Sequence, residues 1–237
     1  MLNLILAAML SFGSYQSDSY VTPSGKQLSF VFFGHASFAV VYDQKVVYLD
    51  PVGSEADYSQ MPKADAILVT HGHGDHLDKE VVAMLSKEGT VLVSTPSVAE
   101  EVAGVTVLRN GEKMEVGDWM TVEAVAAYNT TPGRDKFHPA GRDNGYIITL
   151  DGERIYVSGD SEPTPEMAHV KNIDYLFLAV NQPYTMTPEQ AASVVNELRP
   201  KVFYPYHYGQ TEEQTNMRHL ARLVDSHATK MKVRDME

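Results

Sequence analysis

The stretch ILVTHGHGDHLD, Ile67 to Asp78, places three histidines and two aspartates directly after a short apolar run. Imidazole and carboxylate groups at this density indicate a metal site, because both side chains are metal ligands in proteins. Side chains alternate in an extended segment, so His71 and His73 are expected to point the same way and to share one ion. Asp75 and His76 lie beyond a second glycine and can turn toward a second ion. The spacing therefore predicts a metal site at the end of a strand.

Composition limits what kind of protein carries this site. The chain has 237 residues, with 43% hydrophobic and 21% charged residues, which is typical of a globular enzyme. Its 19 basic and 31 acidic side chains give a net charge of −12, which repels polyanions. We therefore expect a small-molecule substrate and no nucleic-acid partner. The chain has no cysteine, so any metal must be held by nitrogen and oxygen ligands.

The N-terminus, MLNLILAAMLSFGSYQSDSY, carries an apolar run from Leu2 to Leu10. The run is too short to span a bilayer, so no stable membrane insertion is expected, but it fits a signal peptide with Ser11-Phe12-Gly13 as the cleavage motif. No lysine or arginine precedes the run, and a helix or strand packed on the domain is the alternative. We expect residues 1–20 to be a signal peptide or an N-terminal extension, and residues 21–237 to be a single domain. The protein is then exported to the periplasm if Met1–Gly13 is a signal peptide, and cytoplasmic otherwise.

The pattern of apolar residues predicts strands followed by strand and helix alternation in each half of the chain, hence two sheets with helices outside. The predicted strands are Leu28–Phe33, Phe38–Tyr42, Val46–Leu49, Ala66–Thr70, Val91–Ser94, Val105–Leu108, Met120–Ala127, Tyr146–Leu150, Arg154–Ser158, Tyr175–Val180 and Lys201–Tyr204. Four helices are predicted. The first begins after Asp78 and stops at Gly89, with Met84 on its apolar face, and the second covers Ser97–Val102. The third begins after Thr187, with Gln190 closing a capping box, and the fourth covers about 212–227.

The segment His71-Gly72-His73-Gly74-Asp75-His76 matches an H-x-H-x-D-H motif, and here the chain resembles the metallo-β-lactamase superfamily from about Leu28 to Gln214. The resemblance implies an α/β fold, the four-layer αββα sandwich, with two metal ions at one edge between the sheets. The ions are usually zinc, with manganese and iron as alternatives. It also implies that Asp160, in RIYVSGDSE, bridges the two ions and that His207, in VFYPYHYG, is the last histidine ligand.

The resemblance further implies a metal-dependent hydrolase. Two cations that share a water lower its pKa toward about 7, and the resulting hydroxide attacks a carbonyl or phosphoryl centre. Asp75 and Asp160 would orient this nucleophile. An aspartate such as Asp50 sits behind a ligand histidine in the family and fixes its tautomer, whereas His35 is expected either to line the cleft or to be structural. The motif GHASF and the stretch NQPYTMTPEQAA look most like the UlaG-like branch, which predicts a small ester, lactone or phosphodiester as substrate.

One ligand of the family is missing from its expected place. After the strand Met120–Ala127 the family has a histidine, but this chain has Asn129, and an amide oxygen is a poor zinc ligand. His138, in the loop sequence GRDKFHPAGRDNG, is the candidate for a replacement ligand, a general acid or a substrate contact. Arg134 and Arg142 make the same loop basic, which favours an anionic substrate unless these charges are simply solvated.

The competing hypothesis is a metal-binding protein of the same fold with a degraded first metal site and little or no hydrolytic activity. Family members are often oligomers, so a homo-oligomer is an open alternative, although no apolar stripe in the sequence predicts an interface.

Overall fold

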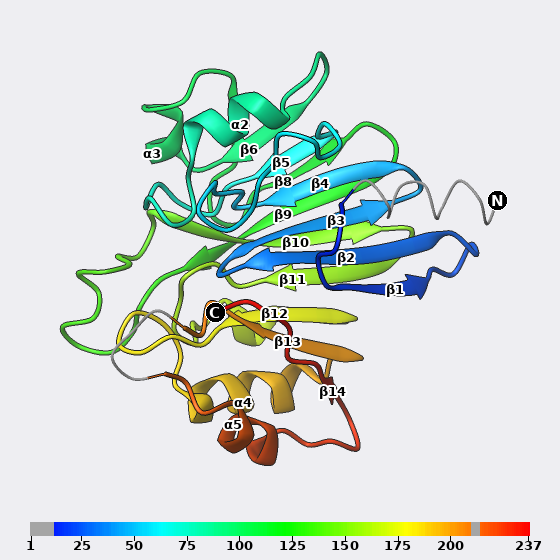
Figure 1. The fold of residues 1–237 in the computed structure, drawn as a ribbon. Coiled ribbons are helices and arrows are strands. Elements are labelled where there is room, and N and C mark those ends of the chain that lie inside the picture. The colour runs from blue at the N-terminus through cyan, green and yellow to red at the C-terminus, as the bar shows by residue number, and fades with distance from the viewer. Residues whose placement is uncertain (1–11, 210–213) are drawn as a thin grey trace. The chain divides into compact units, whose positions relative to one another are not determined.

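A computed structural model describes residues 12–209 and 214–237 of the protein. The chain divides into two compact units, the first ending at Val107 and the second beginning at Leu108. Each unit is built around one seven-stranded mixed sheet whose strands follow one another in sequence order (Figure 1). The two units therefore share one topology.

The first unit begins with an antiparallel meander and ends with parallel strands. Strands β1 to β4 pair antiparallel, and β4 to β7 pair parallel. Parallel neighbours need a crossover connection; α2 lies in the one between β5 and β6, and α3 lies in the one between β6 and β7. The elements are β1 Ser17–Val21, β2 Gln27–Gly34, β3 Ser37–Tyr42, β4 Lys45–Leu49, β5 Ala66–Leu68, α2 Lys79–Leu85, β6 Val91–Ser94, α3 Pro96–Ala99 and β7 Val105–Val107.

The second unit repeats this plan, with β8 to β11 antiparallel and β11 to β14 parallel. Helices α4 and α5 connect its parallel strands and lie side by side (Figure 1). The elements are β8 Lys113–Val116, β9 Met120–Ala127, β10 Asp143–Leu150, β11 Glu153–Val157, the 3-10 helix η1 Met167–His169, β12 Tyr175–Ala179, α4 Pro188–Leu198, β13 Val202–Tyr206, α5 Met217–Leu223 and β14 Lys230–Met231.

Local sequence signals explain several element boundaries. Asp78 caps α2, because its side chain accepts the backbone N–H groups of Glu80 and Val81. Thr187 and Gln190 form the predicted capping box of α4. Asp151 and Gly152 both have positive φ, 51° and 83°, which is the backbone conformation of a tight hairpin turn between β10 and β11.

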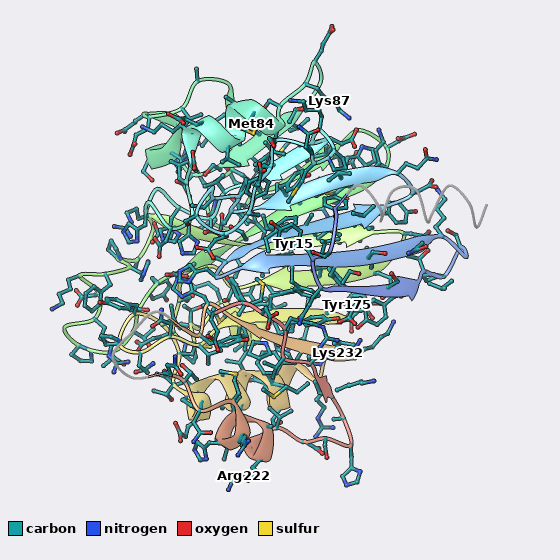
Figure 2. The ribbon with its side chains drawn as sticks, viewed as in Figure 1. Tyr15, Met84, Lys87, Tyr175, Arg222 and Lys232 are labelled. Atoms are coloured by element: carbon teal, nitrogen blue, oxygen red, sulfur yellow. The ribbon has the colours of Figure 1, made fainter. Side chains whose placement is uncertain are left out.

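Other boundaries differ from the predictions. Helix α2 ends at Leu85 rather than at Gly89, because Ser86 adopts extended angles while its N–H still reaches the carbonyl of Val82. Met84 is 42% exposed and does not lie on the buried face of α2 (Figure 2). The second predicted helix is confined to α3, and the last helix, α5, begins only after its cap Asn216, with Arg222 extending from it into solvent (Figure 2).

Three strands were not predicted from the sequence, and the reason is the same for each. Strands β1, β8 and β14 carry few buried residues and stand at or near the edges of their sheets. Exposed edge strands need no continuous apolar run, and that run is the pattern that predicts the other strands.

The N-terminal residues that the structure describes belong to the first unit. Phe12 is buried, with its ring centroid 6.1 Å from that of Phe33 and 6.3 Å from that of Tyr48. Strand β1 then pairs with β2 over its full length. The apolar run Leu2–Leu10 and Ser11 lie outside the described residues. Within residues 12–209 and 214–237, no helix combines the length and the hydropathy that crossing a membrane requires.

Candidate metal-binding site

Polar side chains of the first unit gather where neighbouring parallel strands end. Leu49 and Leu68 are register partners at the carboxyl ends of β4 and β5, so Asp50 and Thr70 follow on adjacent strands. The backbone N–H and the hydroxyl of Thr70 both donate to the Asp50 carboxylate, each at 2.7 Å. The carboxyl end of parallel strands is where α/β sheets place their ligands.

His76 is the third member of this buried group. Its Nδ1 lies 2.8 Å from Oδ2 of Asp50, and the side chain is fully buried. A carboxylate accepts hydrogen bonds, so in the neutral ring this contact places the imidazole proton on Nδ1 and leaves Nε2 as the nitrogen that could bind a metal. Nε2 lies 3.8 Å from Oδ2 of Asp75. Asp50 adopts φ 43°, a left-handed conformation that is uncommon for a residue other than glycine and is often found at functional sites.

His71 and His73 approach each other through ring nitrogens. Nε2 of His71 lies 3.0 Å from Nδ1 of His73, while Nδ1 of His71 lies 3.0 Å from the hydroxyl of Thr70. The backbone turns here, because the carbonyl of His73 accepts the N–H group of His76 at 3.0 Å. The ring centroids of His71 and His76 are consequently only 4.1 Å apart. These three imidazoles therefore form one cluster within the first unit.

His35 and Asp75 form a pair beside this cluster. Nε2 of His35 lies 3.2 Å from Oδ2 of Asp75. His35 is buried and has φ 49°, whereas the Asp75 side chain is 49% exposed. His35 thus contacts a predicted metal ligand directly, which favours a role in the site over a purely structural one.

In the second unit, three neighbouring parallel strands end in polar residues. Asp160 lies beyond the end of β11, Asn181 beyond β12, and His207 directly after β13. Oδ2 of Asp160 lies 3.3 Å from Nε2 of His207 and 3.4 Å from Nε2 of His138. All four side chains are buried. Two imidazole nitrogens therefore converge on one carboxylate oxygen.

His138 reaches this place because the β9–β10 loop closes on itself. The N–H group of Asn129 donates to the carbonyl of His138 at 2.9 Å. The Asn129 side-chain amide donates to the carbonyls of Tyr184 at 2.7 Å and Arg134 at 3.2 Å. Asn129 therefore fixes the loop, and His138 is the residue that faces Asp160.

Both histidines also contact a polar partner on their far side. Nδ1 of His138 lies 3.1 Å from Oδ2 of Asp143, and Nδ1 of His207 lies 2.9 Å from Nδ2 of Asn181. Arg142 donates to Oδ1 of Asp143 at 2.6 Å and to Oδ2 at 2.8 Å, and the hydrogen bond to Asp143 raises the pKa of Arg142. Asn181 begins the stretch NQPYTMTPEQAA but was not predicted to contact a site histidine, and Asp143 could only have been suspected from the adjacent arginine.

Glu162 holds the same loop in place through several hydrogen bonds. Its buried carboxylate accepts the N–H groups of Thr130 and Thr131, the hydroxyl of Thr131 and the guanidinium of Arg134, at 2.6 to 3.0 Å. Burial acts to raise the pKa of Glu162, but these hydrogen bonds outweigh it and lower the pKa. Arg134 and Arg142 are therefore each matched by a buried carboxylate, which reduces the positive charge that the loop offers to a ligand.

Comparison with known proteins identifies relatives of the chain. The sequence model of a family described as the beta-lactamase superfamily domain matches residues 29–207. A UPF0173 metal-dependent hydrolase from Thermococcus onnurineus is 31% identical over 190 residues, covering 75% of this chain and 83% of that protein.

Solved structures extend the likeness. A Parabacteroides distasonis protein, whose proposed identity is a metal-dependent hydrolase, is 44% identical with a TM-score of 0.89, covering 94% of this chain and 100% of that chain. A proposed Zn-dependent hydrolase of the metallo-beta-lactamase superfamily from Thermotoga maritima has 21% identity and a TM-score of 0.59, covering 86% of this chain and 96% of that chain. With the two mixed sheets, these matches confirm the predicted α/β fold class, that of the metallo-β-lactamases.

Proposed function

The chain belongs to the β-lactamase superfamily and, within it, to the UPF0173 metal-dependent hydrolases, and we propose that it hydrolyses a small ester, lactone or phosphodiester with the help of two zinc ions. We place it in the UlaG-like branch on the motifs around His35 and Asn181. The observation that carries the proposal is the convergence of His138 and His207 on Asp160, at 3.4 and 3.3 Å.

In the first unit the proposed ligands are His71, His73, Asp75 and His76. In the second unit they are Asp160, His207 and His138. Imidazole nitrogens and carboxylate oxygens are the donors that zinc accepts in a protein without cysteine. His76 already presents Nε2 because Asp50 binds its Nδ1 at 2.8 Å, and His138 is arranged likewise by Asp143. The donor set thus fits zinc.

Bound metal ions would supply an activated water and would stabilise the negative charge that develops on the substrate. Asp75 is the most exposed of the proposed ligands with an anionic side chain, since its side chain is 49% exposed while that of Asp160 is 3% exposed. Asp75 can therefore accept a proton from, and orient, a water that enters from solvent, with His35 holding its carboxylate at 3.2 Å.

His138 takes the place of the ligand that the sequence lacks at Asn129. Because His138 is buried and faces Asp160, it fits a metal ligand better than an exposed general acid. The alternative hypothesis, a degraded first metal site, assumes that Asn129 occupies the place of the missing histidine ligand. Since Arg134 and Arg142 are both paired with carboxylates, we favour neutral esters and lactones over phosphodiesters as substrates.

Metal content and turnover test the proposal together. The purified protein is expected to hold two zinc equivalents by elemental analysis, and to hydrolyse at least one member of a panel of esters, lactones and phosphodiesters. A chelator should abolish turnover, and added zinc should restore it. His76→Ala and Asp160→Ala should lose metal and activity, whereas His219→Ala, which removes an exposed histidine paired with Glu189, should keep both. One metal equivalent without turnover on the whole panel would instead support the metal-binding protein.

Export to the periplasm is a further part of the proposal and rests on the apolar run Leu2–Leu10. N-terminal sequencing of the protein from its native host tests it, because an uncleaved chain in the cytoplasm would contradict export.

A further inference from the structure

The two histidines that face Asp160 have chemically different partners behind them. Nδ1 of His138 meets a carboxylate, Asp143, whereas Nδ1 of His207 meets a carboxamide, Asn181. A histidine binds a metal through a ring nitrogen that carries no proton, so the partner of the other nitrogen decides whether the ring is ready to bind.

Asp143 allows only one tautomer of His138. Its carboxylate receives two hydrogen bonds from Arg142, at 2.6 and 2.8 Å, and such a charge-assisted pair keeps it ionised. An ionised carboxylate only accepts hydrogen bonds, so the Nδ1 atom of His138, 3.1 Å away, must be the donor. In the neutral ring the proton of His138 therefore sits on Nδ1, and Nε2, which faces Asp160, is the nitrogen available to a metal.

Asn181 allows both tautomers of His207. The amide nitrogen stands 2.9 Å from Nδ1 of His207, while its buried oxygen has no hydrogen-bond partner in the described part of the chain. Reversing the amide exchanges the two atoms and lets the oxygen accept a proton from Nδ1. The proton of His207 can therefore sit on either ring nitrogen, depending on the orientation of Asn181.

We propose that Asp143 and Asn181 are positioning residues that make the two histidines unequal: Asp143 prepares His138 for metal before metal arrives, whereas His207 becomes ready only when the Asn181 amide turns. The proposal rests on the proposed function only in taking both histidines as ligands. The tautomers themselves are properties of the metal-free protein and do not depend on any substrate.

Nitrogen-15 NMR of the metal-free protein reads the tautomers directly. Long-range proton–nitrogen spectra at pH 8, assigned with His138→Gln and His207→Gln variants, are expected to show His138 as the single Nδ1–H form. In Asp143→Asn, Arg142 should retain the amide oxygen, so the amide nitrogen should face Nδ1 and move the His138 proton to Nε2. In Asn181→Asp, His207 should become fixed in the Nδ1–H form. Finding His138 in the Nε2–H form in the parent protein would overturn the proposal.

Zinc affinity, measured by competition with a coloured chelator, gives the second readout. Asp143→Asn is expected to bind its weaker zinc equivalent at least about 10-fold less tightly, the usual effect of losing such a partner. Glu162→Gln is the matched control, because Glu162 is a buried carboxylate that anchors the same loop through Arg134 without contacting His138. It should keep the parent tautomer and lose less affinity.

Equal losses of affinity in Asp143→Asn and Glu162→Gln, with the same tautomer in both, would mean that Asp143 only holds the loop and would contradict the proposal. Absence of hydrolysis on every substrate would contradict the proposed function and leave these two measurements unaffected.

Discussion

Replacing Glu162 by glutamine is expected to destabilise the metal-free protein by about 2 to 4 kcal/mol at neutral pH. Oε1 of Glu162 accepts the Thr131 hydroxyl at 2.8 Å and the Arg134 guanidinium at 3.0 Å, and Oε2 accepts two backbone N–H groups at 2.8 and 2.6 Å. Glutamine has a single side-chain oxygen. If that oxygen accepts the two backbone N–H groups, the side-chain NH2 group faces the Arg134 guanidinium, and both groups are donors. A hydrogen bond to a charged group contributes about 1.5 to 3 kcal/mol, and the two backbone bonds weaken when their acceptor becomes neutral.

The stability difference between the parent and Glu162→Gln should depend on pH, and the pKa of Glu162 gives the direction of this dependence. Because hydrogen bonds lower the pKa of Glu162 in the folded protein, its contribution is complete above the unfolded value of about 4.3 and disappears as the pH falls through the lower folded pKa. The stability gap between the parent and Glu162→Gln should therefore be largest at pH 7 and narrow below about pH 4. Urea unfolding of chelator-treated protein between pH 7 and pH 3 measures the gap. Removing the metal first keeps the pH-dependent loss of metal out of the comparison.

The control for this experiment is Glu166→Gln, which changes an exposed carboxylate four residues away that bonds the Tyr128 hydroxyl at 3.0 Å. It should change the free energy of unfolding by less than about 0.5 kcal/mol. A gap for Glu162→Gln below about 0.5 kcal/mol at pH 7, or one that stays constant down to pH 3, would refute the reasoning.

Other substitutions probe the two units separately. Phe12→Ala should cost about 3 to 5 kcal/mol in urea unfolding, and a chain that begins at Ser14 should lose as much; equal stability of either with the parent would show that the buried ring is dispensable. Asp50→Ala leaves buried donors without their acceptor, so it should cost about 2 to 4 kcal/mol and weaken zinc binding in a chelator competition, whereas unchanged zinc affinity would contradict its positioning role. His138→Ala should lose one zinc equivalent by elemental analysis while Asn129→Ala keeps both; the reverse result would make Asn129 the ligand.

Much of the fold could be predicted because its signals are local. The buried strands β2, β3 and β4 carry nearly continuous apolar runs, and the ends of α2 and α4 are set by side chains that cap their own backbone. Edge strands such as β1 and β8 alternate exposed and partly buried residues, so nothing in their composition separates them from loops. Such a strand forms because it pairs with the neighbouring strand of the sheet, and the strand's own sequence carries no information about that partner.

The sequence placed the proposed ligands where they follow strands, whereas it named His138, in a loop, only as one candidate and left its role open. Asp160 and His207 lie close after β11 and β13, so their place follows from the strand itself. His138 lies nine residues after Asn129, yet the hydrogen bond from the Asn129 N–H group to the His138 carbonyl, 2.9 Å, returns it to the end of β9. Position along the chain points to Asn129, while closure of the loop brings His138 to face Asp160.

Loop closure also explains why so many buried polar groups surround one histidine. A loop between two strands has few apolar residues to hold it, so its conformation must come from hydrogen bonds. Asn129 and Glu162 hold the part of the loop that follows β9. Asp143, with Arg142, holds His138 where the loop enters β10. If these contacts serve ligand placement, mutating any of them should loosen zinc binding, and mutating Asp143 should loosen it most. Only Asp143, which contacts the ring itself, should also move the imidazole proton.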